Sequence, residues 1–295
     1  MVNCMSKLMI LDGNNILLRA LFAPIESEMT YNGESTGVLY RCMNMVFRHL
    51  REFKPTHFIC TFDHGRSEYR LKKRPEYKAN RDDSRDADPD AQQKREAYLY
   101  ELHRWQSTLE DLYLNWVSQP RVEADDIIAS LCHGYPGQKL VISSDHDLRQ
   151  LASPSVRVHA PAQNRHATSV TFDPNKVREK YGCTPDDLPK MWALSGDKGD
   201  NIIGLHRVGE KTALKKLIEH QFDFPETVEA LAKTPEDRER VLGNLDLIEL
   251  HPELFTDLPD YTGLEVTYDL LQQDILEMSE KYGFDSFKNR IDRLV

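Results

Sequence analysis

The stretch LMILDGNN, residues 8–15, places four apolar residues directly before an aspartate, Asp12. A later stretch repeats this layout: FICTFDHG, residues 58–65, carries its apolar run up to Asp63. Each run has the length of a buried strand. Such runs alternate with helix-length segments as far as about residue 172. This alternation predicts an α/β fold, a parallel sheet with helices on its faces.

The other expected elements follow from the same patterns. A third apolar run, LVISSDHD at residues 140–147, again ends in aspartates. We expect strands near 7–11, 57–62, 139–143, 155–159 and 168–172, and helices near 37–53, 91–117, 123–133 and 146–152. From about Asp173 the pattern turns mainly helical.

Nine carboxylates stand at or near these strand ends and the turns that follow them. They are Asp12, Asp63, Glu123, Asp125, Asp126, Asp145, Asp147, Asp197 and Asp200. The carboxyl ends of parallel strands open onto one crevice, so we expect many of these side chains to lie together. Their mutual repulsion in a low-dielectric cleft would be strong unless cations held them. Oxygen-only ligand sets select Mg²⁺ or Mn²⁺, and carboxylate two-metal sites hydrolyse phosphodiesters, so the pattern predicts a metal-dependent nuclease.

The charge distribution agrees with this prediction although the net charge is −10. The nine carboxylates account for nearly all of that excess. Two segments, 66–81 and 198–216, are strongly basic, and local sign matters more than net charge for binding an anion. Each segment taken alone is more typical of a solvated surface than of a binding site.

Composition indicates a globular protein of the reducing cytosol. The chain has 295 residues, of which 40% are hydrophobic and 29% charged, as is usual for such proteins. No apolar stretch is long enough for a membrane helix, and no signal-peptide layout is visible. The five cysteines are dispersed without CxxC spacing, which argues against disulfides and zinc. We expect a cytoplasmic protein, of a bacterium or a phage-infected cell, that does not bind membranes.

Three segments have both a functional and an ordinary interpretation. In VEADDI, Glu123 and Asp126 share a helix face and could bind metal, but acidic residues also favour any helix N-terminus. The polar segment 82–90 is a candidate hinge within an insertion that could act as a lid. GLHRVGEKTALKKL, residues 204–217, predicts a hairpin whose following helix offers N–H groups to phosphate, or an ordinary turn between packed helices.

Seven segments together resemble the flap endonuclease and 5′–3′ exonuclease family, which includes free-standing phage enzymes and the 5′-nuclease domain of bacterial DNA polymerase I. The matching segments are LDGNN, PTHFICTFDHG, YRLKKRPEYKANR, VEADDIIA, ISSDHDLRQL, TFDPNKVREKYG and ALSGDKGDNIIGLHRVGEKTA. The resemblance runs in register from about residue 7 to 216.

The resemblance implies a Rossmann-like (PIN-like) nuclease core, a helical arch and a helix–three-turn–helix that grips duplex DNA. We expect the core at 1–187, with the arch at about 70–117, and the DNA-binding module with the C-terminal helices at 188–295. The last forty residues carry no chemistry that we can assign.

The resemblance also implies roles for particular residues. Asp12, Asp63, Glu123, Asp125, Asp145 and Asp147 match the metal-binding cluster, with Asp12, Asp63 and Asp145 central to catalysis, and Asp126, Asp197 and Asp200 match positions that complete or support a second metal site. The expected DNA contacts are Arg70, Tyr77, Lys78, Arg81, Gly204, Arg207, Gly209, Lys211, Thr212 and Lys215.

Four of these residues lie at the start of the arch. Lys78 and Arg81, spaced i and i+3, would share a helix face and stabilise the transition-state charge on one phosphate. Arg70 would position phosphate through its planar fork of donors. Tyr77 would stack on a terminal base or, alternatively, pack inside the protein.

The hairpin departs from the family pattern at Arg207, where a glycine is usual. If this position needs a positive φ, arginine is strained there. In the family the hairpin carbonyls can hold K⁺. Arg207 puts K⁺ binding in doubt, and the alternative is direct contact of Arg207 with phosphate.

The expected reaction is hydrolysis of DNA at a 5′ end or a single-strand/duplex junction by two Mg²⁺ ions roughly 3.5–4 Å apart. Mn²⁺ would substitute for Mg²⁺, and the protein would act as a monomer on flaps, nicks or gaps in replication or repair. Two alternatives stay open. A PIN-type ribonuclease, or cleavage of the RNA strand of RNA–DNA hybrids, would need RNA as substrate, and a non-catalytic junction-binding protein would have lost metal ligands.

Overall fold

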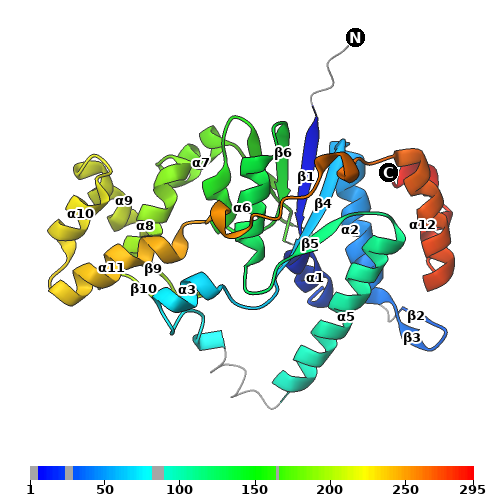
Figure 1. Ribbon diagram of the computed structural model, residues 1–295, viewed down its shortest axis with the longest axis horizontal. Helices are drawn as coiled ribbons and strands as arrows, with labels where there is room; N and C mark the ends of the chain where they lie inside the picture. Colours follow the sequence, from blue (N-terminus) through cyan, green and yellow to red (C-terminus); the bar gives the residue numbers. More distant parts are fainter. Residues whose placement is uncertain (1–5, 24–28, 82–89, 164–165) are drawn as a thin grey trace, which may run out of the picture.

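A six-stranded sheet lies in the middle of an elongated molecule, with a group of helices at one end and the C-terminal helices at the other (Figure 1). The computed structural model describes all residues except 1–5, 24–28, 82–89 and 164–165. The proposed hinge at 82–90 therefore falls almost entirely outside the described residues.

The strand order of the sheet is β5-β4-β1-β6-β7-β8. Its strands are β1 (Lys7–Asp12), β4 (His57–Phe62), β5 (Trp116–Ser118), β6 (Gln138–Ile142), β7 (Val156–Ala160) and β8 (Val170–Phe172). Short pairs outside the sheet are β2 (Thr30–Tyr31) with β3 (Glu34–Ser35) and β9 (Gly196–Asp197) with β10 (Ile202–Ile203).

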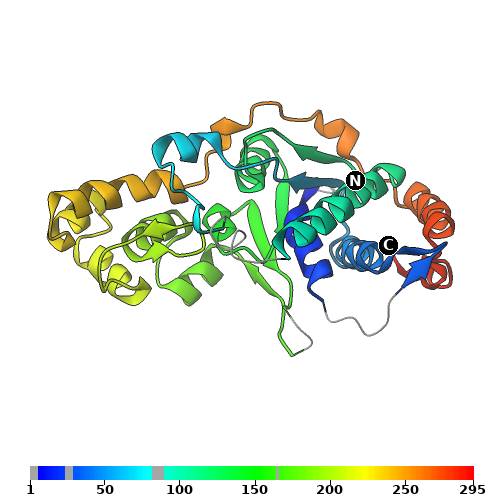
Figure 2. The same ribbon diagram turned by 90° about the horizontal axis from the view of Figure 1, so that it is seen from below.

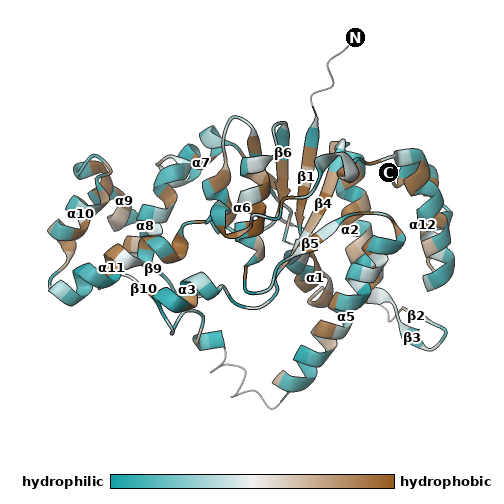
Figure 3. Cartoon of the chain, in the orientation of Figure 1, coloured by the Kyte–Doolittle hydropathy of each residue, from teal (hydrophilic) through white to brown (hydrophobic). Residues whose placement is uncertain are grey.

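Helices cover both faces of the sheet, as its apolar strands require (Figure 3). The longer helices are α1 (Gly13–Leu21), α2 (Gly37–Phe53), α5 (Ala91–Asp111), α6 (Ala124–Gly134), α7 (Pro174–Tyr181), α8 (Leu188–Ser195), α9 (Glu210–Glu219), α10 (Phe224–Leu231), α11 (Pro235–Ile248) and α12 (Tyr268–Tyr282). The shorter ones are α3 (Glu68–Lys73), α13 (Asp285–Lys288), η1 (Asp147–Leu151), η2 (Pro185–Asp187), η3 (Pro252–Leu254), η4 (Tyr261–Leu264) and η5 (Ile291–Arg293).

The fold differs from the expectation in two elements of the sheet. The helix expected to reach residue 117 ends at Asp111, because Tyr113 adopts a left-handed conformation (φ 52°) and the chain then enters edge strand β5. The last strand, β8, pairs antiparallel with β7. A parallel pairing would need a crossover of a dozen or more residues, and the connection between these strands is shorter.

The helical group at 174–248 is tied together at a tight backbone crossing. Gly196 has a left-handed φ of 80°, and a Cβ atom added there would lie 2.4 Å from the backbone nitrogen of Gly204. The Gly204 position is equally closed, with a backbone carbon of Ser195 at 2.3 Å from an added Cβ. Both glycines therefore serve packing, since no side chain fits at either position.

We expected the C-terminal helices to belong with that helical group, at 188–295. They pack elsewhere. Val266 N–H donates to the Thr56 carbonyl beside β4. Phe287 stacks on Tyr40 of α2 with ring centroids 4.6 Å apart. The segment after α11 thus crosses back over the sheet, and α12 packs beside α2 and α5 (Figures 1 and 2).

No helix in the described part of the chain is long and apolar enough to span a bilayer. The cysteines at 42, 60, 132 and 183 are all buried and unpaired.

Candidate active site

Asp12 and Asp63 lie at the carboxyl ends of the adjacent parallel strands β1 and β4. Asp12 caps helix α1 by accepting from the backbone N–H of Asn15 at 3.0 Å, and it also accepts from Ser143 Oγ at 2.7 Å. Asp63 accepts from the backbone N–H of Ala124 at 2.7 Å. The bond from Ala124 orients the Asp63 carboxylate toward the start of α6 (Ala124–Gly134).

Helix α6 brings two further carboxylates to the same place. Glu123, its N-cap residue, is buried and accepts from Tyr77 OH at 3.0 Å and from Lys78 Nζ at 2.8 Å. Asp125 lies in the first turn, and the charges of Asp145, Asp12 and Asp63 all act on it. Asp12, Asp63, Asp125 and Asp145 therefore form one electrostatic group, which we call the first acidic group.

A second acidic group forms where η1 meets the β9–β10 hairpin. It consists of Asp145, Asp147, Asp197 and Asp200, and Asp147 is acted on by the other three. The backbone N–H of Asp147 donates to Asp145 Oδ1 at 3.0 Å, which holds the SSDHD turn closed. Because Asp145 belongs to both groups, it lies between them.

The protonation behaviour shows that this clustering is unfavourable without cations. Burial, together with Asp63 and Asp145, raises the pKa of Asp12 to about 7. Burial and neighbouring carboxylates also raise the pKa values of Asp125 and Asp147 well above the ordinary range. Such a cluster is stable at neutral pH only if positive charge compensates it.

Two cations meet this need at one edge of the cluster. Lys78 Nζ lies 2.8 Å from Glu123 Oε1 and 3.5 Å from Asp200 Oδ2, and Arg81 lies 2.6 Å from Asp200 Oδ1. Burial alone would lower the pKa of Lys78, but Glu123 and Asp200 outweigh it and raise that pKa. The ammonium is therefore charged at neutral pH.

The prediction that Lys78 and Arg81 share a helix face is wrong, because Lys78 is not in a helix. Its backbone is left-handed, with φ of 57°, and lies in a turn. The two side chains converge through the ion pairs with Asp200 instead of through a shared helix face.

Asp126 does not face the acidic cluster. Its carboxylate is fully buried and accepts from both terminal nitrogens of Arg70, at 2.5 and 3.0 Å, and from the backbone N–H of His251 at 2.9 Å. These three bonds use both oxygens of Asp126. We therefore correct its expected role: Asp126 is a structural anion and not a metal ligand. The helix face that it shares with Glu123 did not predict this difference.

Arg70 and Tyr77 are likewise closed off from solvent. Arg70 is 2% exposed and also donates to the carbonyls of Leu247 and Glu249, so it cannot reach a phosphate in this arrangement. The Tyr77 ring is also 2% exposed, and its hydroxyl contacts Glu123 and Asp200 at 3.0 Å each. The structure thus favours the packed alternative for Tyr77 over base stacking.

The hairpin residues follow β10 in the chain, shortly after Asp200, the last carboxylate of the cluster. Arg207 has a φ of 62°, so arginine occupies a left-handed position, as we had expected if the family's glycine were needed there. Its side chain is exposed, as are Gly209, Lys211, Thr212 and Lys215 at the start of α9. Gly204, by contrast, acts through backbone packing.

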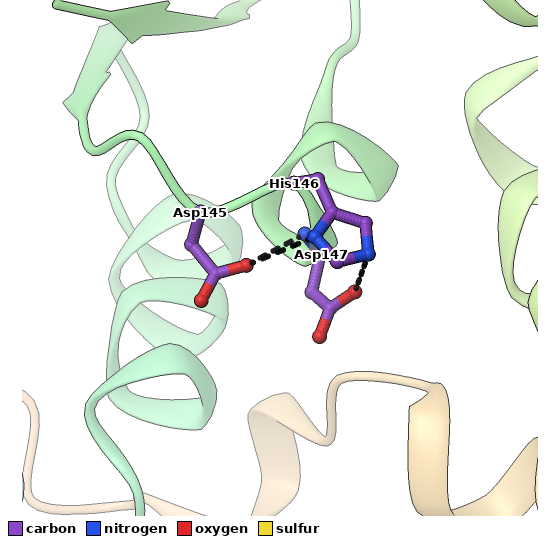
Figure 4. Close-up of side chains that lie close together, drawn as sticks. All are labelled: Asp145, His146 and Asp147. Carbon is purple, nitrogen blue, oxygen red and sulfur yellow. Dashed lines mark hydrogen bonds and ion pairs between the residues drawn. The ribbon is translucent and has the colours of Figure 1, made fainter. Parts of the chain in front are cut away.

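Several polar residues of the site were not singled out from the sequence. Asn14 accepts from the Asp63 N–H and donates to the hydroxyl of Tyr98 on α5, and Asn15 bonds Ser144. The available signal was the polar run after each strand, in DGNN and SSDHD. Another residue that was not singled out is His146, whose ring lies beside Asp145 and Asp147 (Figure 4).

A family model described as the 5′-3′ exonuclease, N-terminal resolvase-like domain, matches residues 7–182. The chain belongs to this family. The match covers the sheet and every carboxylate of the first acidic group, whereas Asp197, Asp200 and the hairpin lie beyond it.

Relatives of this 5′–3′ exonuclease family member include DNA polymerase I of Mycobacterium bovis, 38% identical over 72% of this chain and 23% of the relative. DNA polymerase I of Bacillus caldotenax is 32% identical over 97% of this chain and 32% of the relative. The chain thus spans about a quarter to a third of the length of these curated relatives.

Solved structures share the fold. The T5 D15 protein co-crystallised with metal ions aligns over 93% of this chain and 98% of its own, with a TM-score of 0.67 at 22% identity. Flap endonuclease-1 from Methanococcus jannaschii aligns over 98% of this chain and 92% of its own, with a TM-score of 0.63 at 19% identity. Both confirm the expected PIN-like fold.

Proposed function

We propose that this chain is a structure-specific 5′ nuclease that hydrolyses DNA phosphodiesters with divalent metal ions. The observation that carries this proposal is the pair of acidic groups that share Asp145, with Lys78 and Arg81 along one edge. Membership of the 5′–3′ exonuclease family supports it.

The donor set of the two acidic groups fits Mg²⁺, with Mn²⁺ as a substitute. Their carboxylates offer oxygen ligands, which hard divalent ions prefer. Asp12, Asp63, Asp125 and Asp145 would hold one ion, and Asp145, Asp147, Asp197 and Asp200 a second. When bound, such ions supply an activated water and neutralise the leaving oxygen.

The remaining residues position the substrate. Lys78 and Arg81 would exchange part of their contact with Asp200 for the scissile phosphate and stabilise its developing charge. The exposed Lys211, Thr212, Lys215 and Arg207 would hold the duplex through its phosphates, which gives structure selection without reading sequence. We propose branched or 5′-ended DNA as substrate, a monomer as the active form, a cytoplasmic location and a role in replication or repair.

The test uses a 5′-flap duplex and a matched single strand, each labelled at both ends, with Mg²⁺ or EDTA. Cutting at the flap junction only in Mg²⁺, with the single strand spared, is the expected result. Cleavage of an RNA flap but not the DNA flap would favour the ribonuclease alternative. Binding without cleavage of either would favour a junction-binding protein.

Asp145→Asn should lower the cleavage rate by several orders of magnitude, because Asp145 belongs to both acidic groups. Single-turnover rates in saturating Mg²⁺ measure this. The matched control is Asp257→Asn, a change at an exposed loop aspartate, which should cleave at the wild-type rate. Wild-type cleavage by the Asp145 variant would remove this residue from the proposed ligand set.

Lys78→Ala should slow the chemical step by roughly 100-fold or more, the usual effect of losing one preorganised group that stabilises transition-state charge. Binding of the duplex should largely survive, since the exposed basic residues of the hairpin and α9 remain. Lys72→Ala, which removes an exposed lysine on neighbouring α3, serves as the control. A loss of binding with an unchanged single-turnover rate would show that Lys78 grips DNA instead of assisting the reaction.

A further inference from the structure

His146 stands between two carboxylates of the second acidic group (Figure 4). Its Nε2 atom lies 3.3 Å from Asp147 Oδ1, and its Nδ1 atom lies 3.7 Å from Asp145 Oδ1. One potential ligand atom from each of these three residues can be chosen so that all lie within 4.8 Å of one another. This spacing is short enough for a single ion to bind more than one of them.

The imidazole is held in this place by packing. Its ring meets the edge of Trp192 on α8, with centroids 5.0 Å apart and planes nearly perpendicular. Trp192 is buried, and helix α8 ends just before Asp197 of the second acidic group. About half of the His146 side chain is exposed, so a nitrogen can reach an ion at the second acidic group without rearrangement of the core.

We propose that His146 provides a nitrogen ligand to the divalent ion of the second acidic group, next to Asp147. The inference rests on the proposed function, because it concerns one of the same two acidic groups. It gives this site a mixed oxygen and nitrogen donor set, whereas the first acidic group offers carboxylate oxygens.

The donor chemistry predicts a consequence for metal choice. Imidazole suits Zn²⁺ and other transition ions, while Mg²⁺ prefers oxygen and keeps several of its waters. Bond lengths of about 2.0–2.2 Å to nitrogen and oxygen place adjacent ligand atoms roughly 3 Å apart. The separation of 3.3 Å between Nε2 and Asp147 Oδ1 agrees with that value. The second site should therefore prefer Mn²⁺ or Zn²⁺ over Mg²⁺ more strongly than the first.

The decisive experiment is pulsed electron paramagnetic resonance of Mn²⁺ bound to the full chain. A directly bound imidazole produces ¹⁴N modulation of the Mn²⁺ echo. We expect this modulation in the wild type and its loss in His146→Gln. The matched control is His64→Gln, because His64 adjoins Asp63 of the first acidic group in the sequence and not the second group. This variant should keep the signal.

Calorimetric titration gives a second measurement on the same variants. His146→Gln should weaken Zn²⁺ binding by roughly tenfold or more, comparable to the loss of a residue that supports a metal ligand, and should leave Mg²⁺ binding near that of the wild type. A wild type without ¹⁴N modulation, or a His146 variant that retains it, would overturn the proposal.

Cleavage of the 5′-flap duplex in Mg²⁺ is measured on the same samples. If the wild type cleaves but shows no ¹⁴N signal, the His146 inference fails and the proposed function stands. If the wild type binds Mn²⁺ with the ¹⁴N signal but cleaves neither DNA nor RNA, the nuclease proposal fails and the metal site stands.

Discussion

The ion pair between Arg70 and Asp126 joins α3 to helix α6 and to the end of α11. Its two partners are buried, and the Arg70 guanidinium also donates to the carbonyls of Leu247 and Glu249. Removing one member of a buried pair leaves the other charge uncompensated. Removing one partner of the pair therefore destabilises the fold by more than the pair as a whole stabilises it.

Arg70→Met should therefore destabilise the protein by about 3–5 kcal/mol, measured by urea unfolding. The double variant Arg70→Met with Asp126→Leu should lose less, because no buried charge is left alone. Part of the loss should persist, since the N–H of His251 and two carbonyls also lose partners. A single variant as stable as the wild type would contradict the assignment of Asp126 as a structural anion.

The hairpin before α9 combines backbone strain with an exposed charged side chain at Arg207. An L-amino acid at a left-handed φ costs roughly 1–2 kcal/mol, and Arg207 adopts such a φ with an exposed side chain. A glycine would relieve this strain, although its greater freedom in the unfolded chain offsets part of the gain. We expect the exposed Arg207 guanidinium to bind phosphate.

Arg207→Gly should leave thermal stability unchanged or slightly higher, while duplex DNA binds more weakly. If Arg207 contacts one phosphate, the slope of log K against log salt should become shallower by about 1. Fluorescence anisotropy at several salt concentrations measures the slope. Arg178→Ala, at an exposed position of α7, is the control for general loss of charge. An unchanged slope in the Arg207 variant would exclude a phosphate contact.

The two acidic groups affect the stability of the whole molecule through the protonation of their carboxylates. The pKa of Asp12 is about 7 in the folded protein against an ordinary value of 3.8, and those of Asp125 and Asp147 are raised as well. Between these values the folded state binds more protons than the unfolded state. The stability of the metal-free protein therefore falls as the pH rises from about 4 to about 7.

In EDTA, the thermal midpoint should thus be lower at pH 8 than at pH 5.5, and Mg²⁺ should raise it far more at pH 8. Differential scanning calorimetry at both pH values measures this. Asp12→Asn should reduce the difference between the two midpoints in EDTA, because it removes one of the carboxylates whose pKa is raised. A metal-free protein that is more stable at pH 8 than at pH 5.5 would contradict the proposed electrostatics.

The sequence by itself determined the central strands of the sheet and the place where the acidic residues gather. Apolar runs of strand length record burial directly, and the end of each run locates a carboxylate at the carboxyl edge of β1, β4 or β6. Strand β4 and helix α2 begin and end at the residues that the pattern predicts. Asp12, Asp63 and Asp145 therefore come together as expected.

Only the tertiary structure decided what each buried polar group faces. Asp125 and Asp126 are adjacent in the sequence, yet Asp125 faces carboxylates and Asp126 faces an arginine that lies 56 residues earlier in the chain. The same holds for Tyr77, which packs against Glu123 and Asp200, and for helix α12, which returns to the core. Local pattern encodes whether a residue is buried, but its partner depends on which distant segment packs against it, and that is set by the fold as a whole.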